Sequence, residues 1–308
     1  MTLKRIVLSI LLISMACAVF PSQKVRIKLL DCSYKGLPGY SHVKFKSQGI
    51  ATVAVGQVVY LGVETGDEDL DIEKYQWSLD APENSGSKLS DATIANPILI
   101  PGQVGQYNIK LTVTTKKGIS IAAALWITAG NFVGNGAVVD MNNKAQCIHC
   151  HREKVEAWKT TAHADAFNRA ISGKLAAGYY KIDCFICHRT GYDKESIWAA
   201  MGKKEYYHFQ EELEKRGLEG FIQDLPQVAN LVSVQCESCH GPGSAHMGKI
   251  DKNQISKPMS PGVCAMCHDS NFKGKGGMTF DNKSNPAGKH PQLDFHASTA
   301  KFPGKRPT

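Results

Sequence analysis

Four short segments of this chain combine two cysteines and one histidine at a single spacing. They read Cys-x-x-Cys-His and cover residues 147–151, 184–188, 236–240 and 264–268. Two thiols at this spacing lie on about one helical turn, so both can form thioethers with one porphyrin, and the histidine that follows can reach its iron. The pattern therefore predicts four sites of covalent c-type haem attachment.

The two residue types in each motif have separate roles. The predicted thioether-forming cysteines are Cys147, Cys150, Cys184, Cys187, Cys236, Cys239, Cys264 and Cys267, and the predicted proximal iron ligands are His151, His188, His240 and His268. Structural zinc could instead use the eight thiolates as two tetrahedral sites. Neither zinc nor dithiol redox chemistry requires a histidine after every second cysteine, so the pattern favours haem.

The remaining histidines are candidates for the distal iron ligands, which bind each haem iron on the side opposite the motif histidine. The chain has 11 histidines, which leaves seven after the four motifs and is enough for bis-histidine ligation throughout. His149 lies inside its own motif and is poorly placed for that iron, whereas His42 could reach a haem of another subunit. Met247 or Met266 could replace a histidine and would raise the haem potential.

The first half of the chain must have another role, because all eight motif cysteines follow residue 146. Its pattern is that of β-strands. Apolar and polar residues alternate strictly over 107–114, which predicts a half-buried strand. Further strands are expected at 57–63, 75–79 and 119–128, separated by turn-rich stretches at 82–86 and 101–105.

These strands resemble those of a PKD domain. The likeness rests on the Val-Val-Tyr-Leu-Gly run at 58–62, the Tyr-Gln-Trp-Ser-Leu run at 75–79 and the Gly-Gln-Tyr run at 105–107. It covers 44–130 and implies an immunoglobulin-like β-sandwich with Trp77 buried between two sheets. A module of this kind implies a spacer or adhesion role without catalytic residues. The acidic loop at 67–71 could hold calcium, but the spacing favours a solvated loop.

The second half is expected to be mainly α-helical and rich in loops, with helices at 152–171 and 196–216. Residues 131–146 are expected to be a linker into it. The overall fold class is thus multidomain, with an all-β immunoglobulin-like sandwich followed by a multihaem cytochrome domain. The expected divisions are 1–18 as a secretory signal, 19–43 as an N-terminal segment, 44–130 as the sandwich, 131–146 as the linker and 147–308 as the tetrahaem domain.

Two strings in this half resemble the tetrahaem cytochromes of the nitrifier electron-carrier type and related filament cytochromes. They are Trp158-Lys-Thr-Thr-Ala-His163 and the Cys-His-Gly-Pro-Gly-Ser-Ala-His run that ends at His246. The resemblance implies that His163 and His246 are distal ligands of haems other than those nearest in sequence. It also implies a distal ligand after the fourth motif, either His296 or His290. His208 is the weakest candidate for the remaining position, where an ordinary packed histidine is the alternative.

The N-terminal segment is predicted to be an export signal. Lys4 and Arg5 precede an apolar run at 6–20, which is short for a membrane span and typical of a secretory leader cleaved after Ala18. Cys17 leaves a lipoprotein as the alternative, and no later segment is predicted to span a membrane. Export agrees with c-type haem, which is attached outside the cytoplasm. Cys32 belongs to no motif and is expected to be a buried thiol rather than an intermolecular disulfide.

The net charge of the chain bears on the kinds of partner that it could bind. The formal net charge of +8 could suggest nucleic acid, but haem propionates and leader removal offset much of it and no recognition fold accompanies it. We expect one-electron transfer to redox partner proteins in the periplasm or at the cell surface, with the membrane contacted only peripherally or by a lipid anchor. The alternatives are a reductase of nitrogen or sulfur oxides with one open haem, and a conductive filament formed by self-association.

Overall fold

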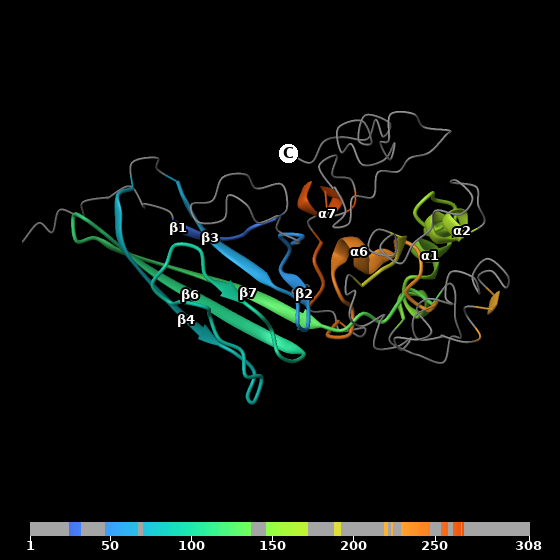
Figure 1. Cartoon of the computed structure of the whole chain (residues 1–308), viewed down its shortest axis with the longest axis horizontal. Coiled ribbons are helices and arrows are strands. Elements are labelled where there is room, and N and C mark those ends of the chain that lie inside the picture. Colours follow the sequence, from blue (N-terminus) through green and yellow to red (C-terminus); the bar gives the residue numbers. More distant parts are fainter. Residues whose placement is uncertain are drawn as a thin grey trace, which may run out of the picture.

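The structure is a computed structural model in which the described residues of the first half form strands and those of the second half include short helices (Figure 1). It describes residues 25–31, 47–66, 70–136, 146–171, 188–191, 219–220, 223, 229–246, 254–257, 261–265 and 267. Among the helices of this described part, none is both long and apolar enough to cross a membrane.

Two sheets pack face to face in the first half. One is antiparallel, in the order β1-β3-β5, and consists of β1 (Val25–Leu29), β3 (Val59–Thr65) and β5 (Ile98–Leu99). The other has the order β2-β7-β6-β4 and consists of β2 (Thr52–Ala54), β7 (Ser120–Gly130), β6 (Gly105–Thr115) and β4 (Ile72–Asp80). Only β2 runs parallel to its neighbour, β7, in this sheet. The arrangement is a β-sandwich, as expected from the strand pattern.

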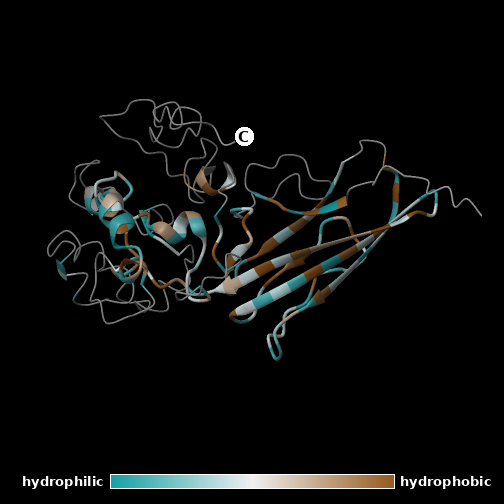
Figure 2. Ribbon diagram, turned by 180° about the vertical axis from the view of Figure 1, so that it is seen from behind, coloured by the Kyte–Doolittle hydropathy of each residue, from teal (hydrophilic) through white to brown (hydrophobic). Residues whose placement is uncertain are grey.

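Strand β6 lies in the middle of the larger sheet and carries the strict alternation seen in the sequence. Its inward residues, Tyr107, Ile109, Leu111 and Val113, are all at most 1% exposed. Their neighbours on the other face include the exposed Lys110, whose Nζ lies 2.6 Å from Asp80 Oδ2 on β4. Figure 2 shows the same alternation as bands of opposite hydropathy along the strands. Burial of one face explains why this pattern forms a strand here.

Trp77 lies in the core between the sheets, as predicted. It is 3% exposed, and its Nε1 donates a hydrogen bond of 2.9 Å to the backbone oxygen of Ile94. Tyr107 is fully buried nearby in the same cluster, and its hydroxyl donates to the backbone oxygen of Gln103 at 2.9 Å. Both aromatic residues therefore bury their rings while their polar atoms are satisfied.

The sandwich begins earlier than the expected boundary at residue 44. Val25 and Ile27 of β1 belong to the same core cluster as Trp77, and β1 pairs with β3 along its whole length. The alternating stretch that forms β1 has only five residues. Such a short run is a weak signal in a sequence, and pairing with β3 is what makes it a strand.

The expected helix over 152–171 is interrupted. Helix α1 (Arg152–Lys159) ends at Lys159, and α2 (Ala166–Ile171) starts after six residues of turns and bends. Thr160 Oγ1 donates to Ala157 O at 2.8 Å and Thr161 Oγ1 donates to Trp158 O at 2.7 Å. These side chains compete for the carbonyls of the last turn, which favours helix termination. The predicted helix at 196–216 lies outside the described residues.

Three haem motifs lie on short helical turns. They are η1 (Cys147–His149), α6 (Cys236–His240) and α7 (Pro261–Ala265), which carries Cys264. For the motif at 184–188, the structure describes His188 but neither cysteine. The mainly helical character of the second half stays a prediction, since much of it lies outside the described part.

Residues 131–136, the first part of the predicted linker at 131–146, are packed against the third motif region. The backbone N–H groups of Val133, Gly134 and Asn135 are all bound by side chains of the third motif region, at 2.7 to 3.1 Å. Asn135 is 1% exposed. Glycine and asparagine indicate irregular backbone, but they do not show whether that backbone is packed.

Candidate haem-binding site

Cysteines of three different motifs lie against one another. The thiols of Cys147 and Cys236 form a hydrogen bond, which raises the pKa of Cys147 and lowers that of Cys236. Burial, with smaller contributions from Cys264 and Cys236, raises the pKa of Cys239 to about 11. The first, third and fourth motifs, far apart in the sequence, are thus neighbours in the fold.

The histidine of the first motif faces a histidine that follows the third. The ring centroids of His151 and His246 are 6.5 Å apart and their planes differ by 16°. Burial, followed by the proximity of His151, lowers the pKa of His246, so its neutral form is favoured. Its Nδ1 is buried without a hydrogen-bond partner in the described structure. A neutral imidazole with an unsatisfied buried nitrogen fits the donor chemistry of a haem iron ligand.

The turn between α1 and α2 places His163 beside the third motif. A pocket of about 210 Å³ is lined by Trp158, His163, Val234, Gln235, Cys236, Cys239 and His240. Trp158 Nε1 donates to Val234 O at 2.8 Å, and Val234 N donates to His163 O at 3.2 Å. The interruption of the helix therefore brings His163 into the same pocket as a motif that lies more than seventy residues later in the sequence.

Two of the motif histidines use Nδ1 for a backbone carbonyl. His188 Nδ1 lies 3.0 Å from Ala166 O, and His240 Nδ1 lies 2.7 Å from Ser256 O. A carbonyl oxygen only accepts, so Nδ1 carries the proton and the lone pair stays on Nε2. Histidines that bind metals are typically held in this way, and both rings fit iron ligation.

A buried glutamate holds the third motif to the segment that leaves the sandwich. Glu237 is 0% exposed, and its carboxylate accepts from the N–H groups of Val133, Gly134 and Gly243 at 2.6 to 3.1 Å. Burial raises the pKa of Glu237, although these three donors act in the opposite direction. The bonds stabilise both the connecting segment and the Gly-Pro-Gly turn after the motif.

Several of the predicted site residues lie outside the described part. They are Cys184, Cys187, His208, His268, His290 and His296, together with Cys17, Cys32, His42, Met247 and Met266. His149 is described, and its side chain is exposed. The calcium prediction is also untested, because the residues at 67–69 are outside the description. Asp71 at the end of that loop pairs with Lys116 at 2.8 Å.

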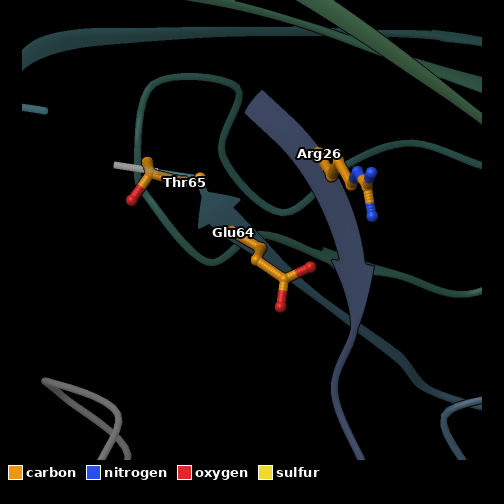
Figure 3. Close-up of a pocket in the computed structure, with 4 residues that line it drawn as sticks. Arg26, Glu64 and Thr65 are labelled. Carbon is orange, nitrogen blue, oxygen red and sulfur yellow. The ribbon is translucent and has the colours of Figure 1, made fainter. Parts of the chain in front are cut away.

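A second pocket lies far from the motifs on the small sheet. It measures about 310 Å³ and is lined by Arg26, Glu64, Thr65 and Gly66, from β1 and the end of β3 (Figure 3). Arg26 and Glu64 are direct partners in the strand register, and both are exposed. Glu64 also lies 3.6 Å from Lys28 Nζ. These are solvated strand side chains, and they offer no contact to the haem motifs.

The sequence did not indicate three residues that hold the third motif in place. They are Glu237, Ser256 and Thr52. Glu237 occupies a variable position of its motif, and Ser256 and Thr52 belong to no recognisable pattern. Their contacts with the sandwich and the connecting segment span more than one hundred residues, as with the 204 residues between Thr52 and Ser256, so no local signal could have identified those contacts.

Each described motif combines thiols with a following histidine, and the short helical turns that carry the motifs meet in space. These features define a c-type cytochrome region. The comparison with known proteins agrees, because residues 146–208 match the family described as Cytochrome c554 and c-prime. The chain is also similar to the cytochrome c-554 of Nitrosomonas europaea, with 27% identity over 148 residues. The resemblance to nitrifier cytochromes is thus confirmed, and it favours covalent haem over structural zinc.

These likenesses cover parts of the molecule. The match to cytochrome c-554 covers 44% of this chain and 52% of the relative, so the chain spans about half the length of that protein. The PKD domain of the KIAA 1837 protein is 21% identical, with a TM-score of 0.23, and covers 27% of this chain and 82% of that domain. The PKD1 domain of Vibrio cholerae metalloprotease PrtV is 23% identical, with a TM-score of 0.19, and covers 26% of this chain and 88% of that domain.

Proposed function

We propose that this chain is a tetrahaem c-type cytochrome that transfers single electrons between redox partner proteins. The observation that carries the proposal is the approach of His246 to the first-motif histidine, His151, with ring centroids 6.5 Å apart. Two imidazoles on opposite faces of one metal have centroids about 6 to 6.5 Å apart, because each metal–nitrogen bond is about 2 Å and each centroid lies about 1.2 Å further on. The spacing supports a bis-histidine site.

The proposed axial ligands pair residues from different motifs. His151 and His246 would share the haem of the first motif, and His240 and His163 would share that of the third. His188 and His268 would be proximal ligands of the other two haems, with distal candidates His296, His290 and His208. The first two pairs follow the resemblance to the nitrifier cytochromes, and the described contacts support them.

The chain's own residues would hold the haems and set their surroundings. When bound, each haem supplies a one-electron ferric–ferrous couple. The motif cysteines would anchor it, the Nδ1 bonds of His188 and His240 would orient the ligand rings, and Trp158 lines the pocket of the third motif. Two histidine ligands on each iron would leave no position for a substrate, which favours electron transfer over reduction of nitrogen or sulfur oxides.

The proposed location is outside the cytoplasm, in the periplasm or at the cell surface. The support comes from the predicted leader at 1–18 and from the covalent haem chemistry, which takes place after export. Self-association into filaments is a further proposal, and its support is the resemblance to filament cytochromes.

The test is a haem count on the purified chain, followed by electron paramagnetic resonance of the oxidised protein. We expect four covalent haems by pyridine haemochrome assay, all retained after acid–acetone extraction, with low-spin signals dominating the spectrum. Fewer than four haems would contradict the tetrahaem assignment. A predominantly high-spin, five-coordinate spectrum would contradict bis-histidine ligation and favour a reductase.

A further inference from the structure

The end of the β-sandwich is packed directly against the third haem motif, where β2 and β7 meet α6 (Figure 1). Gln48 Nε2 donates to the backbone oxygen of Ser238 within α6, at 2.5 Å. Asn131 N donates to Ser244 Oγ at 2.7 Å, and Ser244 N donates back to Asn131 O at 3.2 Å. The sandwich and the haem motif therefore share a hydrogen-bonded interface, which a flexible spacer would lack.

Backbone contact at this interface is close enough to require glycine. Gly241 directly follows His240 and has a φ of +80°. A side chain at this position would collide with the carbonyl oxygen and the Cβ of Thr52. Thr52 belongs to β2, so the residue that directly follows the motif lies against the sandwich with no intervening layer.

Ser256 connects His240 to this interface. Its backbone N–H donates to His240 O at 3.1 Å, and its carbonyl accepts from His240 Nδ1 at 2.7 Å. The position of one carbonyl therefore sets both the tautomer of the ring and the strength of its outer hydrogen bond.

The side chain of Ser256 is held in turn by the sandwich. Thr52 N donates to Ser256 Oγ at 3.1 Å, and Ser256 Oγ donates to Thr52 Oγ1 at 3.0 Å. Thr52 is 1% exposed and Ser256 is 8% exposed, so these bonds do not exchange readily with water. Thr52 is itself fixed in β2 by its parallel pairing with Thr128 of β7.

We propose that Thr52, acting through Ser256, is a positioning residue by which the β-sandwich sets the redox potential of the haem attached at the third motif. The inference rests on the proposed ligation by His240. A hydrogen bond from Nδ1–H to a carbonyl raises the basicity of the ligating nitrogen, which stabilises the oxidised iron and lowers its potential. Loss of the Thr52–Ser256 contact would free the Ser256 carbonyl to move, weaken the ring bond and raise that potential.

The test uses the full chain with its haems and two variants, Thr52→Val and Ser256→Ala. Thr52→Val removes the hydroxyl acceptor but keeps the backbone N–H, whereas Ser256→Ala removes both side-chain bonds. Spectroelectrochemical titration should show one of the four potentials shifted upward in each variant, by more in Ser256→Ala, with the others unchanged. Thr52→Ser, which keeps the hydroxyl, should restore the wild-type value.

The controls separate the possible results. Thr112→Val on β6 and Ser78→Ala on β4 make the same chemical changes away from the interface and should leave all potentials unchanged. Four haems with wild-type potentials in both Thr52→Val and Ser256→Ala would overturn this inference and leave the proposed function intact. A wild-type chain with no haem at the third motif would overturn the proposed ligation as well. If Thr52→Val does not fold, Ser256→Ala decides the result.

Discussion

Glu237 occupies an interior position of a haem motif, where its buried carboxylate accepts three backbone N–H groups and has no cation beside it among the described residues. Two effects on its pKa compete. Burial disfavours the charged form, the N–H groups favour it, and burial prevails, so the pKa in the folded protein lies above its usual value. The folded protein therefore binds this proton more tightly than the unfolded chain does.

The raised pKa gives a pH dependence with a definite sign. The contribution of Glu237 to stability is fully present below the unfolded pKa of about 4.3 and is lost as the pH rises through the higher folded pKa. Glu237→Gln removes this titration. The difference in melting temperature, wild type minus Glu237→Gln, should therefore fall as the pH rises from 4 to 7, as measured by circular dichroism. A difference that increases with pH would show that the three N–H groups prevail instead.

The proposed distal histidines can be tested one residue at a time. His246→Ala and His163→Ala should each convert one low-spin haem to a high-spin form, because each removes one of two strong axial ligands. Electron paramagnetic resonance of the oxidised variants measures the change. His149→Ala is the matched control, since this exposed side chain lies in a motif but is not proposed as a ligand. A full set of low-spin signals in His246→Ala would refute its pairing with His151.

At the scale of single elements, β6 shows how burial on one face stabilises a strand. Its four inward side chains are at most 1% exposed and contact residues from both sheets. The α1 segment illustrates the opposite case. Its helical pattern continues past residue 160, but threonine side chains bind its last carbonyls and the chain turns toward the third motif. That turn, rather than the helix, positions His163.

The contribution of the sandwich core can be measured with Ile109→Ala. Ile109 is fully buried, so the variant should lose about 2 to 5 kcal/mol of unfolding free energy through lost transfer and cavity formation. Urea denaturation followed by tryptophan fluorescence gives the value. Ile119→Ala makes the same change at a side chain that is 45% exposed and should cost no more than about 0.5 kcal/mol. Equal losses in the two variants would contradict the assignment of β6 to the core.

At the scale of the whole molecule, two sets of hydrogen bonds join the sandwich to the region of the third haem motif. One set holds the connecting segment, and the other comes from the sandwich itself. Glu237 and Gln235 bind the backbone at 133–135, while Thr52 and Gln48 reach Ser256 and Ser238. Such contacts couple the two halves, so the sandwich should unfold together with the third motif rather than independently of it.

Limited proteolysis tests this coupling at Phe132. Chymotrypsin should cleave after Phe132 slowly in the wild type, because the next three N–H groups are bound and the segment cannot extend into a protease. Glu237→Ala removes the acceptor for two of these groups and should accelerate cleavage several-fold, as followed by mass spectrometry. Glu83→Ala, which alters an exposed turn of the sandwich, should not. Rapid cleavage of the wild type at Phe132 would show that the segment is a free linker.

The sequence alone predicted the chemistry of the motifs and determined the main strands of the sandwich. Thioether formation needs only two cysteines and a histidine at a local spacing, and a half-buried strand needs only alternation, so both are visible within a few residues. The residues involved were the motif cysteines, Trp77 and the inward face of 107–113.

Only the tertiary structure decided which distant groups meet. It placed His246 beside His151, His163 beside the third motif, and Thr52 against Ser256 across 204 residues. It also showed that β1 belongs to the sandwich and that 131–136 is packed. These pairings arise from burial and hydrogen bonding between segments that share no local pattern, and such interactions exist only once the chain has folded.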